Sequence, residues 1–151
     1  MTSPEQKWAS MSNEAQTVTE VEVAAVYNQL EPVDAKFLLG DWTGGDLDTG
    51  HIAHKALQGM RWAGKSFRSV DDVDPIIVYD DHNNRVWNKD FGHAILREVK
   101  FRGIISTAMI YDQFPIIDHF RCVNNDMVAG AMDTKQYGDA GVYYFFLRRI
   151  K

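Results

Sequence analysis

The second half of the chain consists of short apolar runs in which apolar and polar residues tend to alternate. A period of two is visible in "AILREVKFRG" and in "IIDHFRCV", where Asp118 and Phe120 share one strand face while His119 and Arg121 share the other. Clusters of Asn, Asp and Gly separate the runs and are typical of tight turns. Further runs rich in Ile, Val, Tyr and Phe are "PIIVYD", "RVWNKD", "ISTAMIYD", "MVAGAMDTK" and "VYYFFLRRI". The pattern predicts about seven or eight strands in an antiparallel sheet that curls or closes.

A helical pattern precedes these strands. Thr19 and Glu22 have the spacing of a capping box, and Pro32 ends the apolar repeat that follows, so a helix is predicted over residues 19–31. A second, short helix is predicted between Gly50 and Gly59. The predicted fold is therefore mainly β (α+β), an antiparallel barrel with one N-terminal helix and a short second helix.

Residues 1–16 are polar and poor in branched apolar residues, so we expect a flexible N-terminal tail there. Residues 17–151 then form a single barrel domain, since 151 residues suit one ordinary domain. The interior of a closed sheet of this size is either filled by side chains or left with a cavity for one small ligand.

Composition narrows the classes of partner. The net charge of -5 and the lack of a basic run argue against a nucleic-acid surface. No segment approaches the roughly 18 apolar residues that span a bilayer, and the N-terminus does not resemble a signal peptide. We therefore expect a cytoplasmic monomer or homodimer without membrane insertion. Cys122 is the only cysteine, which excludes an internal disulfide and a thiolate metal cluster.

The known motifs of catalysis and cofactor binding are missing. His51 and His54 lie three positions apart instead of the four that a zincin requires, so we expect them to be cap or surface residues and expect no metal site. No serine has a G-x-S-x-G setting, and Cys122 in a strand is best explained as a small buried hydrophobe. "GDWTGG" lacks the spacing of a nucleotide-binding loop. We therefore expect no cofactor.

The segment Gly40-Asp41-Trp42 is better explained as a structural device. Glycine allows a sharp turn, and the large indole can close one end of a small barrel. A guanidinium from Arg148 or Arg149 over the indole face would add about 1 kcal/mol. We predict that Trp42 contacts one of these arginines.

These residues also carry a family resemblance. Gly40–Gly44 match the motif that gives the GXWXG family its name, which here covers segment 37–65. "TGH", "RWAGKSF", "FRG", "AMIYDQFPIIDHFR" and "GAMD" resemble this family and the domain of unknown function that follows it, here the strand-rich segment 66–151. The resemblance implies a lipocalin-like or fatty-acid-binding-like barrel without a cofactor. It implies no single activity.

The candidate site consists of polar groups embedded in apolar strands. The catalytic candidates are Lys65, Tyr111, Asp112, His119 and Arg121. The candidate ligand-binding wall consists of Trp62, Phe67, Trp87, Met109, Phe120 and Met132. Burying such polar groups costs several kcal/mol unless they pair or meet a ligand. The alternative is a scaffold of paired charges, for example Asp112 or Asp118 with Arg121 or Lys65.

Three functions fit this pattern. The chain could be a carrier of a lipophilic molecule, a cofactor-free enzyme that folds such a molecule into a reactive shape, or a filled barrel used in assembly. Orienting a flexible substrate and donating one hydrogen bond to its carbonyl group can lower the activation barrier of such a reaction without a nucleophile or metal. We favour the enzyme, a cyclase or isomerase of the Diels-Alderase type in natural-product biosynthesis, with a non-catalytic intracellular carrier as the alternative.

Overall fold

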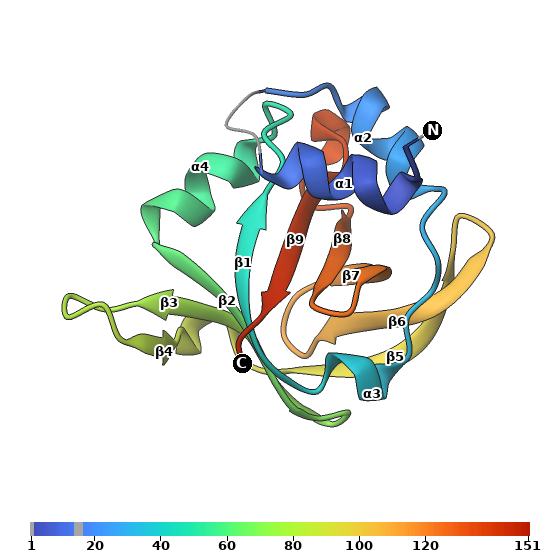
Figure 1. Cartoon of the computed structure of the whole chain (residues 1–151). Coiled ribbons are helices and arrows are strands. Elements are labelled where there is room, and N and C mark those ends of the chain that lie inside the picture. Colours follow the sequence, from blue (N-terminus) through green and yellow to red (C-terminus); the bar gives the residue numbers. More distant parts are fainter. Residues whose placement is uncertain (1, 14–16) are drawn as a thin grey trace.

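The computed structural model describes residues 2–13 and 17–151, and the strands of this part form one antiparallel sheet (Figure 1). Its nine strands run in the order β2-β1-β9-β8-β7-β6-β5-β3-β4, and β2 also pairs with β3, so the sheet curves into a ring. The strands are β1 (Gly40–Asp46), β2 (Trp62–Ser69), β3 (Asp72–Tyr79), β4 (Arg85–Trp87), β5 (Ala94–Phe101), β6 (Ile104–Tyr111), β7 (Ile116–Asn124), β8 (Met127–Thr134) and β9 (Tyr143–Arg149). The mainly β, antiparallel prediction is confirmed. The short strand β4 pairs with β3 and is not one of the strands that close the ring.

The two predicted helices are present, although the first is shorter than expected. Helix α2 (Glu20–Tyr27) begins as predicted, with the Thr19 hydroxyl accepting a hydrogen bond from the Glu22 backbone N–H at 3.1 Å. Helix α4 (Ile52–Gly59) is the predicted second helix. The further helical segments are α3 (Ala35–Leu38) and the 3-10 turns η1 (Lys89–Phe91) and η2 (Gly138–Ala140).

The expectation of a flexible tail is wrong for residues 4–13, which form helix α1 (Pro4–Asn13). Ser3 and Gln6 make a reciprocal capping box, with bonds of 3.1 Å and 3.0 Å, and Pro4 occupies the first helical position. Trp8 is fully buried against Tyr27 and Tyr144, and this burial anchors the helix. Residues 1 and 14–16 of the expected tail lie outside the described part of the chain.

Alternation along the strands creates two apolar cores. The inner core fills the ring and includes Trp42, Phe67, Phe120 and Phe145. The outer core lies between the outer face of β7, β8 and β9 and the helices α1 and α2, and includes Tyr27 and Tyr144. Strand β7 is therefore buried on both faces.

The Gly40–Gly44 motif closes one end of the ring. Gly40 has φ of 122°, a conformation that favours glycine. Trp42 is fully buried; its indole N–H donates to the Leu38 carbonyl at 2.7 Å, and the Arg149 guanidinium lies 4.4 Å from its ring. The predicted contact with a late arginine is confirmed. Gly44 leaves space for the Trp62 indole, which a β-carbon at position 44 would overlap.

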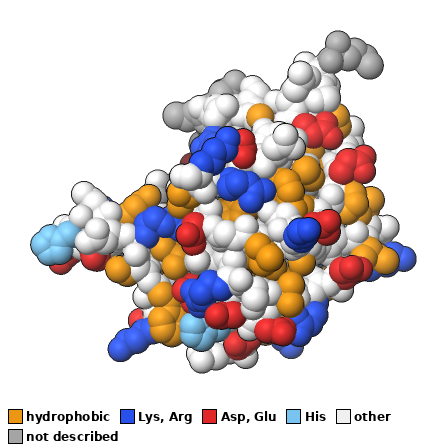
Figure 2. Space-filling view, turned by 60° about the horizontal axis from the view of Figure 1, so that its bottom comes forward, with side chains coloured by type: hydrophobic (Ala, Val, Ile, Leu, Met, Phe, Trp, Pro, Cys, Tyr) orange, Lys and Arg blue, Asp and Glu red, His pale blue; other side chains and the backbone are white. Residues whose placement is uncertain are grey.

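The outer surface carries both signs of charge. In the face shown in Figure 2, acidic and basic side chains are interspersed among apolar ones, without a large patch of one sign. In the described part of the chain, no helix has the length and apolar character needed to cross a bilayer.

Candidate functional site

A largely apolar cavity of about 140 Å³ lies inside the ring, next to helix α4. Helix α4 contributes Ala53, Ala56 and Leu57 to its wall. Aromatic side chains from the three strands β2, β6 and β9 form a further part of the wall: Trp62, Tyr111, Tyr143 and Phe145. An apolar cavity of about 150 Å³ can hold a benzene-sized molecule, so this cavity suits a ligand of similar size.

A buried ion pair forms the polar part of this cavity. The Lys65 ammonium on β2 lies 3.1 Å from Asp118 Oδ2 on β7 and donates to the Pro75 carbonyl at 2.9 Å. Each of the two charged side chains is only about 2% exposed. The aromatic rings of Trp62, Tyr111 and Phe145 surround the Lys65 nitrogen at 5.7, 5.8 and 5.3 Å.

The low-polarity surroundings act against both charges. Burial lowers the pKa of Lys65, an effect that the Asp118 charge opposes. Burial raises the pKa of Asp118, opposed by the Lys65 charge. Both directions favour transfer of a proton from the ammonium to the carboxylate. The pair is therefore suited to exchanging a proton with a bound molecule.

Asp118 has an unused hydrogen-bonding atom in this apolar setting. Its Oδ1 atom is buried and has no hydrogen-bond partner among the described residues. An unpaired buried oxygen costs about 1–3 kcal/mol, more for a charged group. The nearby Tyr111 hydroxyl stays protonated, because burial raises its pKa and the Asp118 charge raises it further. A ligand with a polar group could satisfy Asp118 Oδ1.

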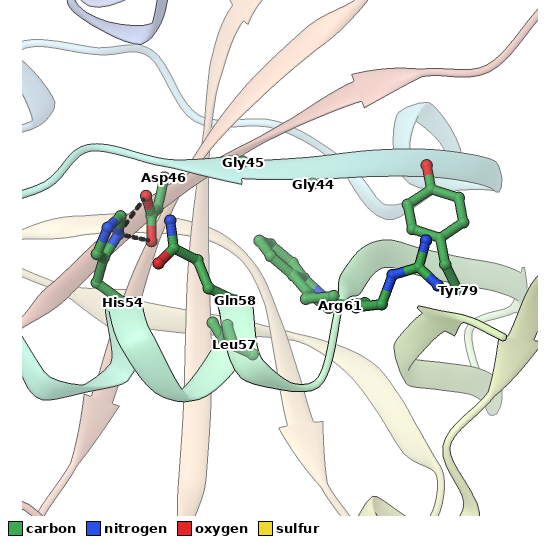
Figure 3. Close-up of a pocket in the computed structure, with 9 residues that line it drawn as sticks. Gly44, Gly45, Asp46, His54, Leu57, Gln58, Arg61 and Tyr79 are labelled. Atoms are coloured by element: carbon green, nitrogen blue, oxygen red, sulfur yellow. Dashed lines mark hydrogen bonds and ion pairs between the residues drawn. The ribbon is translucent and has the colours of Figure 1, made fainter. Parts of the chain in front are cut away.

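An outer groove of about 410 Å³ lies between strand β1 and helix α4 (Figure 3). Gly44 and Gly45 line it along β1, and Trp62 and Leu57 line both the groove and the inner cavity. Trp62 is thus a partition between the two spaces.

A chain of hydrogen bonds connects the groove with the cavity wall. His54 Nδ1 lies 2.9 Å from both carboxylate oxygens of Asp46. Asp46 Oδ2 in turn accepts a hydrogen bond from the Tyr143 hydroxyl at 2.6 Å. Burial raises the pKa of Tyr143, and the charge of Asp46 raises it further, so the hydroxyl remains protonated and acts as a hydrogen-bond donor. These bonds fix the orientation of Tyr143 at the cavity.

Neither predicted cap or surface histidine belongs to a cluster of ligating side chains. His51 caps α4 by accepting from the Ala53 N–H at 3.0 Å, and its Nε2 atom lies 3.2 Å from the Gly141 carbonyl oxygen. Among the described residues, no group of three or more His, Cys, Asp or Glu is arranged to hold a metal ion.

Two of the five catalytic candidates line the cavity, namely Lys65 and Tyr111. The other three candidates do not line the cavity. Asp112 is exposed just after β6. His119 and Arg121 lie on the outer face of β7, because they alternate with the inward-facing Asp118 and Phe120.

Two of the six wall candidates, Trp62 and Met132, line the cavity. Phe67, Met109 and Phe120 point into the ring but belong to its packed core and do not border the cavity. Trp87 does not line the cavity, since β4 pairs only with β3 and lies outside the ring. Its indole is 39% exposed, stacks on His93 at 4.3 Å and donates to the Gly92 carbonyl at 2.9 Å.

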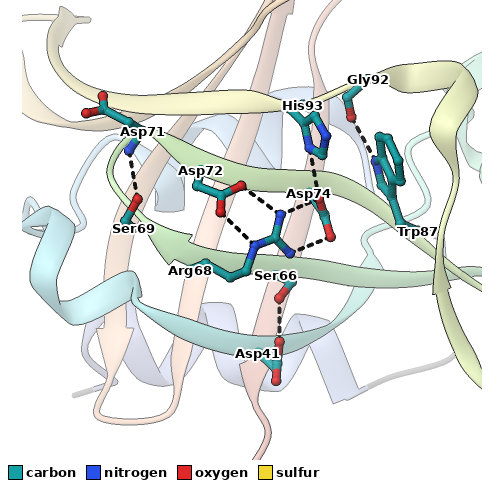
Figure 4. A network of polar contacts seen from close by, with 10 residues as sticks. All are labelled: Asp41, Ser66, Arg68, Ser69, Asp71, Asp72, Asp74, Trp87, Gly92 and His93. Atoms are coloured by element: carbon teal, nitrogen blue, oxygen red, sulfur yellow. Dashed lines mark hydrogen bonds and ion pairs between the residues drawn. The ribbon is translucent and has the colours of Figure 1, made fainter.

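A surface network surrounds His93 and explains this position of Trp87 (Figure 4). Arg68 makes bidentate contacts with both Asp72 and Asp74, and His93 also contacts Asp74 at 3.0 Å. The charges in this network are paired with one another at the surface. The network connects Arg68 on β2 with Asp72 and Asp74 on β3.

Sequence analysis underestimated Asp118 and overlooked Tyr143, Phe145 and the α4 residues. Asp118 is one of the polar groups embedded in the apolar strands, but it is not among the five catalytic candidates. A usable signal was present, because Asp118 shares its strand face with Ile116 and Phe120, and a carboxylate on an apolar face is unusual. The contribution of α4 carries no such signal, since it depends on how the helix packs over the ring.

Fold and cavity together define a small β-rich protein whose antiparallel sheet curves into a ring around a largely apolar cavity. The family models agree with the sequence motifs: residues 25–82 match the GXWXG protein family, and residues 92–149 match the domain of unknown function DUF4334. The chain belongs to this family.

One solved structure is similar over almost the whole length. It is the crystal structure of a protein from Thermomonospora curvata, 42% identical, with a TM-score of 0.92, and the match covers 98% of this chain and 99% of that one. The comparison with curated proteins found no match.

Proposed function

We propose that the chain is a lipocalin-like container that binds a small lipophilic molecule carrying one polar group and converts it by cofactor-free isomerisation or intramolecular cyclisation. The observation that carries the proposal is the Lys65–Asp118 pair in an otherwise apolar cavity, with Asp118 Oδ1 unpartnered. A scaffold charge is normally satisfied by the protein, whereas Asp118 borders the cavity and its Oδ1 atom has no hydrogen-bond partner among the described residues.

The chemistry follows from the position of the pair. A carboxylate beside an ammonium in a low-dielectric cavity can remove a proton from a bound molecule and return it at another atom. The apolar wall fixes the shape of the molecule while this transfer takes place. Isomerisation by proton transfer uses both properties.

The size of the cavity limits the ligand. At about 140 Å³ it is smaller than the roughly 300–1,000 Å³ typical of drug-sized ligands. The proposed ligand is therefore a compact molecule, near benzene in size, unless Trp62 moves and joins the cavity to the outer groove.

Binding can be tested with benzyl alcohol, which combines a ring of suitable size with one hydroxyl. NMR titration should shift the backbone amide signals around Lys65 and Asp118. Ala53→Leu, which fills the cavity, should abolish these shifts, and Ala25→Leu on the exposed face of α2 should preserve them. Shifts that survive Ala53→Leu, or no shifts at all, would refute the container.

Native mass spectrometry of the protein purified from its own source should then reveal a retained small molecule. Incubation of fresh protein with that molecule separates the two functions. Appearance of an isomer of the same mass supports the enzyme, and retention without conversion supports the carrier. The carrier has one specific observation in its favour: the cavity contains a single ion pair, and a carrier needs only one or two polar anchors.

A further inference from the structure

The nitrogen of Lys65 is held in a position suited to covalent chemistry. Two protein groups contact it, the Pro75 carbonyl at 2.9 Å and Asp118 Oδ2 at 3.1 Å. An ammonium has three N–H groups, so one bonding position is not used by these two oxygens. Lys65 lines the cavity, and the surrounding side chains on that side are aromatic.

We infer that Lys65 is a nucleophile that condenses with the carbonyl carbon of a small aldehyde or ketone in the cavity to form an imine. The inference rests on the proposed container function and specifies its ligand class as carbonyl compounds. A lysine in an apolar pocket beside a proton acceptor is the usual setting for such chemistry.

The atoms and charges of the step balance within the cavity. Lys65 first gives a proton to Asp118, which leaves a neutral amine and a neutral carboxyl. The amine lone pair attacks the carbonyl carbon, the C=O π bond breaks, and its oxygen takes the Asp118 proton. A nitrogen-bound proton then returns to Asp118 and passes to the hydroxyl group, whereupon the C–O bond breaks and water leaves. The product is a protonated imine beside the Asp118 carboxylate.

Two observations support this assignment of roles. Asp118 lines the cavity beside Lys65, and its Oδ1 atom has no hydrogen-bond partner among the described residues, so the carboxyl group has capacity for a hydrogen bond to the oxygen of a bound carbonyl compound. Burial lowers the pKa of Lys65 and raises that of Asp118, and both effects favour the neutral amine that the attack requires.

The test uses benzaldehyde, which is close to the cavity in size, and sodium cyanoborohydride, whose hydride reduces an imine to a stable secondary amine. The full chain is treated with equimolar benzaldehyde, and each lysine is quantified by peptide mapping. The exposed Lys55 and Lys89 serve as internal references. Lys65 should be benzylated at least about tenfold faster than either, because a bound aldehyde has a high effective concentration at its nitrogen.

Competition and substitution sharpen the test. Benzyl alcohol occupies the same space but has no carbonyl, so it should suppress labelling of Lys65 and leave that of Lys55 unchanged. Asp118→Asn, which is nearly isosteric, should slow labelling of Lys65 by about tenfold or more through loss of the proton acceptor. Labelling of Lys65 at the rate of Lys55, or labelling that benzyl alcohol does not suppress, would overturn the inference.

The experiment also distinguishes this inference from the proposed function. If benzyl alcohol binds in the NMR titration but Lys65 is not selectively labelled, the container stands and the imine is wrong. If benzyl alcohol does not bind and Lys65 is not labelled, both are wrong. The main measurement uses the unmodified chain, so it does not depend on whether a Lys65 variant folds.

Discussion

The two faces of strand β7 handle buried charge in opposite ways. On the outer face, Arg121 donates to the Leu30 and Phe101 carbonyls, both at 3.1 Å, and its guanidinium lies 4.8 Å from the Tyr27 ring. On the inner face, Asp118 has one oxygen on Lys65 and the other without a partner. Both side chains are almost completely buried.

The difference separates scaffold from site. Arg121 joins the ring to the segment after α2, and every neighbour that it contacts belongs to the protein. Asp118 borders the inner cavity, and its Oδ1 atom has no hydrogen-bond partner among the described residues. The proposed site is therefore distinguished from the scaffold by burial beside a cavity together with an unsatisfied polar atom, and not by burial alone.

The largest effect on stability is expected from replacing Trp42, a residue of the ring that supports both faces of the sheet. Trp42→Ala should lower the free energy of unfolding by about 3–5 kcal/mol, because it removes a fully buried indole at the closed end of the ring. Chemical denaturation measures this loss. Benzyl alcohol affinity, measured where the variant is folded, should change little; loss of binding in a stable variant would assign the motif to the site.

Arg121→Met tests the scaffold face. The methionine fills part of the same volume but donates no hydrogen bond, so buried carbonyls of Leu30 and Phe101 lose their partner. We expect a loss of about 2–4 kcal/mol in the free energy of unfolding, with unchanged labelling of Lys65. If labelling of Lys65 fell in the folded variant, the division between the two faces would be wrong.

The opposite result is expected for the inner pair. Replacing both partners, by Lys65→Met with Asp118→Leu, should raise the free energy of unfolding by about 1–2 kcal/mol, since well-packed apolar side chains often outperform a buried ion pair. Asp118→Leu alone should be destabilising, because it leaves Lys65 without a counter-charge. A double variant that is less stable than the wild type would make the pair structural instead of functional.

The smallest expected effect is on the pH dependence of stability, and it involves His119 on the outer face of β7. Burial lowers the pKa of His119. This effect outweighs that of Asp133, which lies 3.1 Å from the Nε2 atom of His119 and acts to raise its pKa. The folded state therefore takes up the proton less readily than the unfolded state, whose histidine has a pKa of about 6.5. Stability should be complete above that pH and decrease as the pH falls toward the lower folded-state value.

His119→Gln is the matched variant for this effect. Thermal unfolding followed between neutral and mildly acidic pH should show a flatter dependence in this variant than in the wild type. An equal slope in both proteins would assign the pH dependence to other groups.

Local patterns predicted the fold well, because they record which backbone conformation each segment favours. The alternation around β5 and β7 and the cap at Thr19 are of this kind. Helix α1 is not predicted although Ser3 and Gln6 carry the capping signal, because it packs through contacts distant in the sequence, above all the burial of Trp8 against Tyr27 and Tyr144.

The candidate site was predicted only in part, for a reason visible in β7. Alternation shows that Asp118 and His119 face opposite ways, but it does not show which face is inside when both are buried. That choice depends on α1 and α2 covering the outer face. Similarly, the alternation in "RVWNKD" contains nothing that places Trp87 on a strand outside the ring.

Closure of the ring between β1 and β9 has a consequence for how the protein is made. Thr43 and Arg148 pair across this seam although they are 105 positions apart in the sequence. Contacts between such distant segments form late, since a long loop must first be ordered. During synthesis the inner face of β1, including Trp42, therefore stays without its partner strand until β9 has left the ribosome. The cavity can be enclosed only after that strand is available.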